Sequence, residues 1–151
     1  MHCKYLTILI LLCLTGCMAN RVKTDVSSQV HVFGIEMYSA VDIREIGGVP
    51  ANEEPCLKGY ERSFEKLDIT IGYGFNRRIR KITSRNPGTS LFGISPGVSA
   101  EEGNRLAQKA GFIQDSPYRY HGHDVSLLLL VDGKGSVFGI TVESSDQSDS
   151  P

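Results

Sequence analysis

The segment His121-Gly122-His123-Asp124 holds the residue types with the clearest capacity for chemistry. Two imidazoles and a carboxylate are a ligand set that zinc and other transition metals accept. Alternate residues of a strand share a face only where the strand is regular, and Gly122 favours a turn. No cysteine and no third histidine lies nearby in the sequence. We therefore interpret the segment first as a polar hairpin turn, and keep His121 and His123 as the ligands of an alternative metal-dependent hydrolase.

A second candidate is a recognition surface of aromatic and basic side chains. Tyr118 and Tyr120 alternate with polar residues, which is typical of a half-buried strand, and Arg78 and Arg80 share one face of another strand. Aromatic rings on the concave side of a sheet make a rigid surface for a partner, whereas rings on the other side belong to the core. We predict these four residues as the binding surface. Core packing of the tyrosines and a solvated strand face for the arginines are the alternatives.

No set of side chains in the sequence has the arrangement of a catalytic site. Ser39, Ser63 and Ser99 lack the strand–turn–helix context of a nucleophilic serine. Gly72-Tyr73-Gly74 lacks the lysine and the following helix of a phosphate-binding loop. The sequence therefore predicts no enzyme, no cofactor and no resident metal.

The first 17 residues have the pattern of a lipoprotein export signal. Lys4 precedes an apolar run from Tyr5 to Leu14, and two small residues and Cys17 follow. We expect cleavage of residues 1–16 and lipidation of Cys17, because two or more acyl chains anchor a protein stably to a membrane. The expected location is the extracytoplasmic side of a bacterial membrane. No aspartate follows Cys17, which favours the outer membrane where the cell has two.

The composition of the mature chain gives little ground for nucleic-acid binding. Removal of residues 1–16 takes Lys4 away and leaves 15 basic and 17 acidic side chains, a net charge of −2. With Cys3 and Cys13 in the signal and Cys17 lipidated, only Cys56 remains, so an internal disulfide is excluded. A small buried hydrophobe is the favoured interpretation of Cys56, and a reactive thiol is the alternative.

The rest of the chain contains an internal repeat. Val32-Phe33-Gly34-Ile35 matches Leu91-Phe92-Gly93-Ile94, and the apolar strand patterns that follow also correspond. We divide the chain into five segments: a signal at 1–16, a tether at 17–30, a first αβββ unit at 31–85, a second αβββ unit at 90–144 and a disordered tail at 145–151.

Each unit is expected to contain a helix followed by three strands. In the second unit Ser99 is a helix N-cap with Glu102 as its capping-box partner, and the helix ends at Gly111. Strands are expected around residues 118–121, over 125–131 and over 137–142, with a tight turn at 132–135. In the first unit we expect a helix from Ser39 to Ile46, a loop over 50–55, strands around 60–64, 67–71 and 79–82, and a turn over 72–76.

A doubled helix-and-meander unit resembles the β-lactamase-inhibitor-protein fold, and single units resemble the BamE-type (SmpA/OmlA) outer-membrane lipoproteins. The resemblance rests on the stretch from Gly93 to Ser99 with the helix to Gly111, and on the lipoprotein signal. It implies an α+β fold in which two tandem units form one curved antiparallel sheet with the helices on one face. The chain departs from the BamE type in its doubling and from the inhibitor type in lacking paired cysteines.

We expect the protein to act as a non-catalytic protein-binding module in the cell envelope. Its partners would be the membrane, through the lipid anchor, and an envelope protein, but no nucleic acid. A metal-dependent hydrolase and a structural lipoprotein of envelope assembly are the two alternatives.

Overall fold

A computed structural model describes residues 31–40, 48–122 and 124–145 of the chain. Two short strands, β1 (His31–Val32) and β2 (Ile35–Glu36), pair with each other. The other described elements are β3 (Asn52–Cys56), β4 (Gly59–Phe64), the 3-10 helix η2 (Glu65–Leu67), β5 (Ile69–Gly74), β6 (Ile79–Ser84), α2 (Ala100–Lys109), β7 (Ile113–Ser116), β8 (Arg119–His121), β9 (Val125–Val131) and β10 (Val137–Ser144).

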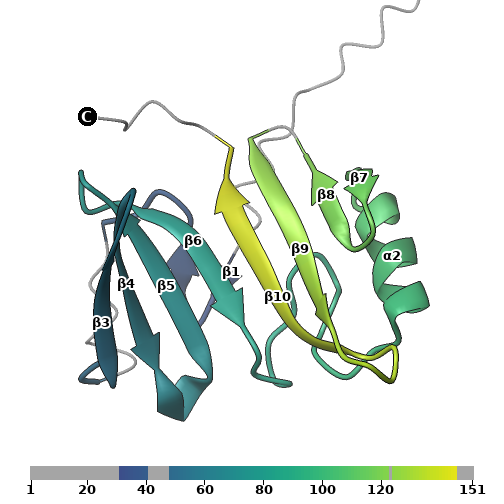
Figure 1. Ribbon diagram of the computed structural model, residues 1–151, viewed down its shortest axis with the longest axis horizontal. Coiled ribbons are helices and arrows are strands. Elements are labelled where there is room, and N and C mark those ends of the chain that lie inside the picture. Colours follow the sequence, from purple (N-terminus) through teal and green to yellow (C-terminus); the bar gives the residue numbers. More distant parts are fainter. Residues whose placement is uncertain (1–30, 41–47, 123, 146–151) are drawn as a thin grey trace, which may run out of the picture.

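Within the described residues, strands β3 to β10 form one antiparallel sheet in the order β3-β4-β5-β6-β10-β9-β8-β7 (Figure 1). The order places two four-stranded meanders side by side, joined where β6 pairs with β10. At the middle of this junction Thr83 is opposite Thr141, and their hydroxyl oxygens are 2.9 Å apart. Backbone pairing therefore runs continuously from one meander into the other.

The repeated Phe-Gly segments form the same tight turn in both halves. Val32 pairs with Ile35, as Leu91 does with Ile94. Phe33 and Gly34 have φ values of 51° and 77°, while the second turn has 56° and 78°. Positive φ at both central residues is the pattern of a type I′ turn, which explains the glycine. The sequence similarity between the halves therefore has a matching backbone conformation.

The segments after these turns also attach to the sheet in the same way. The backbone N–H of Tyr38 donates to the carbonyl oxygen of Ile79 at 2.8 Å. In the second half, the N–H of Gly97 donates to the carbonyl oxygen of Val137 at 2.7 Å. Each segment thus binds the first residue of the strand, β6 or β10, that lies at the centre of the sheet.

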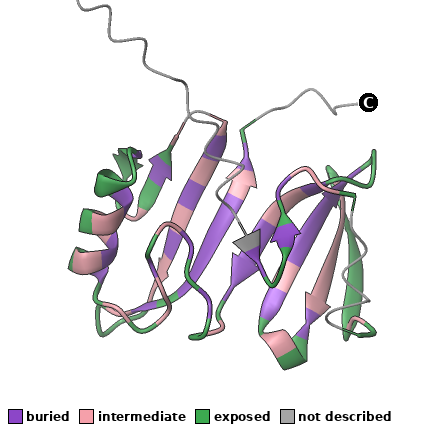
Figure 2. Ribbon diagram, turned by 180° about the vertical axis from the view of Figure 1, so that it is seen from behind, coloured by how far each residue is buried: buried purple, intermediate pink, exposed green. Residues whose placement is uncertain are grey.

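The hydrophobic core lies on one face of the sheet, which we call the core face. Strands β1 and β2, the turn at residues 91–94 and helix α2 lie behind the sheet in Figure 1 and in front of it in Figure 2. Ile71, Ile82, Leu127 and Val142 are fully buried on this face and form one cluster with residues from both meanders. The two halves therefore share a single core.

Helix α2 confirms the sequence prediction for the second half. The Oγ atom of Ser99 accepts a hydrogen bond from the backbone N–H of Glu102, so Ser99 is the N-cap. The helix packs against the sheet with its small residues Ala100, Gly103 and Ala107. Among the described residues no helix is long and apolar enough to cross a membrane.

The predicted α+β class with helices on one face is wrong. The described residues hold a single α-helix of 10 residues beside an eight-stranded antiparallel sheet, so the fold is mainly β. The meanders have four strands rather than three, because β3 and β7 add an edge strand to each. The first predicted helix falls largely on residues 41–47, outside the described ranges, as do the predicted signal at 1–16, the predicted tether at 17–30 and the predicted tail from 146.

Two predicted boundaries in the first half were also wrong. The expected loop at 50–55 overlaps strand β3, which begins at Asn52, and the expected turn at 72–76 begins three residues too early because Gly72 to Gly74 belong to β5. A β-bulge shifts the register between Gly72 and Tyr73, and β10 has a corresponding shift after Val137. The extra residue explains why buried Ile79 and Ile82 are three positions apart instead of two.

Candidate functional site

The face of the sheet opposite the core, which we call the open face, carries a row of polar and charged residues. The strand register places five residues from neighbouring strands side by side: Glu61, Gly72, Lys81, Glu143 and Ser126. A parallel row consists mainly of hydroxyl side chains: Ser63, Thr70, Thr83 and Thr141. Thr83 and Thr141 are buried. Since strands fix the spacing of side chains across a sheet, the other side chains of the two rows form a rigid polar surface.

Gly72 creates the space at the centre of the charged row. The Lys81 Nζ atom lies 2.9 Å from Oε1 of Glu61, although strand β5 separates the two residues. A methyl group on Gly72 would come within 2.9 Å of the Lys81 Cβ atom. The missing side chain therefore lets Lys81 lie across β5 and reach Glu61.

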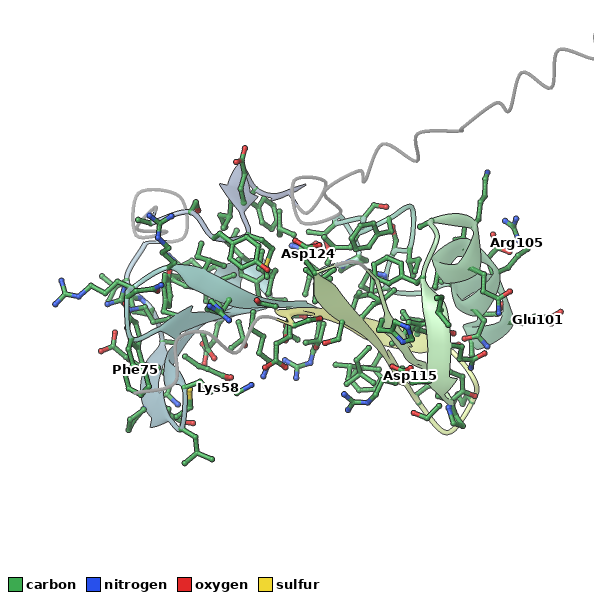
Figure 3. All side chains as sticks on the ribbon, turned by 90° about the horizontal axis from the view of Figure 1, so that it is seen from above. Lys58, Phe75, Glu101, Arg105, Asp115 and Asp124 are labelled. Carbon is green, nitrogen blue, oxygen red and sulfur yellow. The ribbon has the colours of Figure 1, made fainter. Side chains whose placement is uncertain are left out.

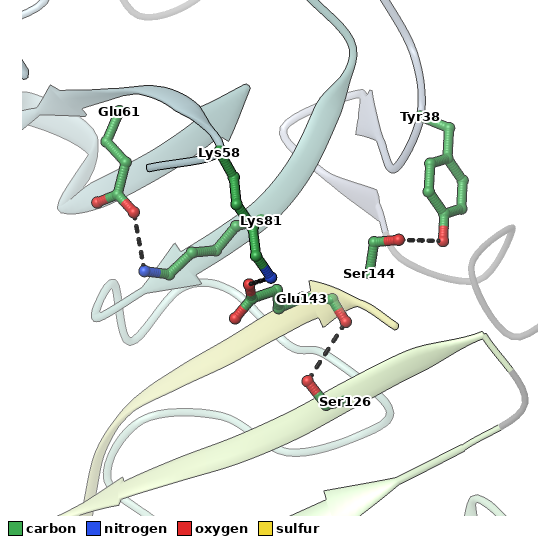
Figure 4. Close-up of polar contacts among 7 residues, drawn as sticks. All are labelled: Tyr38, Lys58, Glu61, Lys81, Ser126, Glu143 and Ser144. Atoms are coloured by element: carbon green, nitrogen blue, oxygen red, sulfur yellow. Dashed lines mark hydrogen bonds and ion pairs between the residues drawn. The ribbon is translucent and has the colours of Figure 1, made fainter. Parts of the chain in front are cut away.

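A second ion pair extends over the open face from the turn between β3 and β4. Lys58 lies at the end of the sheet far from helix α2, which carries Glu101 and Arg105 in Figure 3. Its Nζ atom is 3.7 Å from Oε1 of Glu143 on β10 (Figure 4). The side chain of Lys58 is 71% exposed, so this pair contributes little stability by itself. The contact does show that the side chain of Lys58, in the β3–β4 turn, reaches the central strand β10.

The turn and the charged row line an open surface cavity of about 310 Å³. Its lining combines an exposed thiol, an aliphatic side chain and both ion pairs: Cys56, Leu57, Lys58, Glu61, Gly72, Tyr73, Arg80, Lys81 and Glu143. This volume is at the lower end of small-ligand sites and suits one large side chain or a short peptide segment. The two lysines and two glutamates can each hydrogen-bond to polar groups of a ligand.

The tyrosines of the predicted binding surface lie in the core or against it. Tyr120 has no exposed surface, and its hydroxyl donates a hydrogen bond to Asn104 Oδ1 on α2. Burial, with a smaller effect of Tyr118, raises the pKa of Tyr120 above its usual value. Tyr118 is half-buried and packs against the core from the turn between β7 and β8. The ring of Tyr120 therefore cannot contact a partner in this conformation, which agrees with the core alternative.

The predicted arginines lie on the other meander, at a distance from the tyrosines. Arg78 is exposed and donates a hydrogen bond through Nη1 to the carbonyl oxygen of Tyr38 at 3.1 Å. Arg80 is half-buried, with its guanidinium 5.9 Å from the centre of the Tyr38 ring, and it lines the cavity. Strands β10 and β9 separate β6 from β8. The structure therefore does not bring the four residues into one surface, and only Arg80 belongs to the cavity.

The described part of the chain contains no group of three metal-ligand side chains. His121 is exposed at the end of β8, where its Nδ1 atom contacts Asp115 Oδ1 on β7. His123, the other residue of the hydrolase alternative, lies outside the described ranges, as does Cys17, the predicted lipidation site. Cys56 is exposed at the cavity rather than buried.

Most residues of the cavity were not predicted from the sequence. Glu61, Lys81 and Glu143 lie on three strands, and only the register places them in one row. A signal was present in Gly72, a glycine inside an otherwise apolar strand, because such a residue often marks a close approach of other groups.

No known protein family matches this sequence, and no curated protein matches it. Among solved structures, the chain is similar to an extracellular protein containing a SCP domain from Bacillus anthracis str. Ames, with a TM-score of 0.51 and 10% sequence identity. The match covers 68% of this chain and 42% of that chain. At this identity the similarity concerns the fold alone. The sequence resemblance to inhibitor-type and BamE-type proteins stays a prediction.

Proposed function

We propose that this protein is a non-catalytic binding module, anchored through Cys17 on the extracytoplasmic side of a bacterial membrane, that holds an envelope protein on its open face. The observation that supports the proposal is the cavity of about 310 Å³ between the β3–β4 turn and the charged row. A rigid sheet with a small recess accepts a protruding side chain of a partner at low entropic cost. The export signal and Cys17 support the location.

The arrangement of charges in the cavity favours binding over chemistry. Glu61 faces Lys81 and Glu143 faces Lys58, so the ammonium groups compensate both carboxylates. A partner can exchange one of these ion pairs for a pair with its own charged side chain, which gives orientation and specificity. Beside the cavity, the half-buried hydroxyl groups of Ser63 and Thr70 offer further hydrogen-bonding groups to a bound backbone, whereas Thr83 and Thr141 are buried and bonded to each other.

A site-specific photo-cross-linker tests the proposal in intact membranes. We would place a benzoylphenylalanine at Ser126, which lies on the open face beside Glu143. The matched control carries the same group at Gln108, an exposed residue of α2 on the other side of the molecule. We expect one dominant cross-linked protein from position 126 and none from position 108.

A variant of the charged row then separates specific binding from proximity. Lys81→Met keeps most of the aliphatic length but removes the charge that pairs with Glu61. We expect the adduct to decrease about tenfold, which corresponds to the loss of one partly buried ion pair at an interface. Equal adducts from positions 126 and 108, or an adduct that Lys81→Met leaves unchanged, would contradict binding on the open face.

A further inference from the structure

Two turns at the cavity end of the sheet form a protruding surface, which we call the tip. It consists of Leu57 and Lys58 in the β3–β4 turn, with Phe75, Arg77 and Arg78 in the β5–β6 turn. The turns are neighbours because Gly59 at the start of β4 pairs with Gly74 at the end of β5. Figure 3 shows Lys58 and Phe75 at the same end of the molecule.

The tip exposes two large apolar side chains to solvent. Leu57 is 97% exposed, so almost none of it packs on the fold, and Phe75 is 56% exposed. Exposed apolar residues that lie singly are common, but here two occupy adjacent turns. Neither side chain has a structural role in the core. Both can therefore be removed from water only by contact with another apolar phase.

The charges at the tip are all positive. Residues 55–59 and 73–79 contain Lys58, Arg77 and Arg78 but no aspartate or glutamate. Arg77 and Arg78 are exposed, and the hydrogen bond from Arg78 ends on a neutral carbonyl group. Lys58 reaches Glu143 at 3.7 Å, so it is partly compensated. The two arginines therefore keep their positive charge available to an anionic surface.

The turn that carries Phe75 is held in a defined conformation. The backbone N–H of Gly74 donates to the carbonyl oxygen of Arg78, and the N–H of Arg77 donates to that of Gly74, both at 2.9 Å. The Oδ1 atom of Asn76 accepts from the N–H of Arg78 at 2.9 Å. Phe75 is therefore presented at a fixed position and loses little conformational freedom on binding.

We propose that the tip docks onto a membrane with anionic lipid headgroups. Leu57 and Phe75 would enter the interfacial region, and the cations around them would meet the lipid phosphates. A standard protein partner buries about 800 Å² on each side in a complementary shape, whereas a narrow convex tip with two apolar side chains fits a fluid surface that can close around it. Docking would orient the sheet on the membrane and place the cavity near the bilayer surface. The inference rests on the membrane location of the proposed function.

The thiol of Cys56 allows the test to be made on the mature lipidated protein. Cys56 is exposed and adjacent to Leu57, and with Cys17 acylated it is the remaining cysteine of the mature sequence. An NBD fluorophore on Cys56 would be measured with vesicles of phosphatidylcholine alone and of phosphatidylcholine with phosphatidylglycerol. Nitroxide groups on the lipid acyl chains then quench NBD only when the tip is docked.

We expect strong quenching on the anionic vesicles and weak quenching on the neutral ones. Each cation near an anionic surface favours docking about fivefold, so Arg77→Gln with Arg78→Gln should lower the ratio of docked to undocked protein about 30-fold at low salt. Leu57→Ser with Phe75→Ser should abolish the quenching. The matched control is Ile113→Ser on edge strand β7, which removes an apolar side chain that is 62% exposed and should leave the quenching unchanged. All the changed residues are exposed, and circular dichroism of each variant verifies the fold.

Three results would overturn the proposal. The first is unquenched NBD on anionic vesicles that carry the protein, and the second is equal loss of quenching in Ile113→Ser. The third is loss of the Ser126 cross-link in Phe75→Ser, a residue outside the cavity lining, while the quenching stays that of the parent, which would assign the tip to the protein partner. Flotation with neutral vesicles reports the anchor at Cys17 separately, so failure of the anchor and failure of the tip are distinguishable.

Discussion

At the scale of single residues, Tyr120 links the sheet to helix α2. Its ring is fully buried, and its hydroxyl donates to Asn104 Oδ1. Tyr120→Phe should lower the free energy of unfolding by about 1 kcal/mol at neutral pH, because one hydrogen bond is lost and Asn104 is only partly buried. Urea unfolding at pH 7 measures this loss, and an unchanged midpoint would show that the hydrogen bond contributes nothing.

The pKa of Tyr120 also predicts a pH dependence. Burial raises this pKa, so the unfolded chain loses the tyrosine proton at a lower pH than the folded protein does. The contribution to stability is therefore complete below the ordinary tyrosine pKa of about 10 and decreases as the pH rises above it. The wild type should lose more stability between pH 9 and pH 11 than Tyr120→Phe. Parallel loss in Tyr120→Phe and the wild type would contradict the assignment.

At the scale of elements, the N-cap of α2 makes a measurable contribution. Ser99→Ala removes the acceptor for the backbone N–H of Glu102 and leaves that donor to solvent. We expect a loss of about 1 kcal/mol in the free energy of unfolding, the usual effect of removing a serine cap. Ser90→Ala, at another exposed serine outside the strands and helices, is the control and should change stability by less than half as much. If both variants lose the same amount, the cap does not stabilise α2.

The sequence predicted those elements whose residues alternate between core and solvent or carry a cap. Strand β9 was predicted over its full range, because five consecutive apolar residues follow Ser126 and alternate residues of the strand are buried. Strands β3 and β7 were not, since every residue of an edge strand here is exposed and the apolar alternation disappears. Pro55 in β3 strengthened the wrong expectation of a loop, although an edge strand tolerates proline.

The candidate site was harder to predict than the strands that carry it. The cavity depends on which residues of β4, β5, β6 and β10 lie opposite one another, and register is a tertiary property. Alternation indicated that Tyr118 and Tyr120 share one side of the chain, but it does not show which face of the sheet other elements cover, so Tyr120 was predicted on the binding surface although it lies in the core. Arg80 was predicted and does line the cavity, while Lys58, Glu61 and Glu143 became visible only in the folded chain.

At the scale of the whole molecule, the shared core predicts that the two meanders unfold together. Ile82 on β6 and Val142 on β10 are opposite each other at the junction and fully buried. Ile82→Ala should therefore lower the free energy of unfolding by about 3 kcal/mol, the usual effect of truncating a buried isoleucine, and should destabilise both halves equally. The control Leu57→Ala, at a residue that is 97% exposed, should change stability very little.

Hydrogen exchange in urea measures the two halves separately and decides between one folding unit and two. Amides of β4 and β5 report the first meander, while those of β8 and β9 report the second. Because the backbone pairing and the core both continue across the β6–β10 junction, both sets of amides should lose protection at the same urea concentration, in the wild type and in Ile82→Ala. If β4 and β5 lost protection first in Ile82→Ala while β8 and β9 kept theirs, the repeat would consist of two independent units. The tip and the cavity would then belong to the first unit alone, and Glu143 on β10 would not be held opposite Lys58.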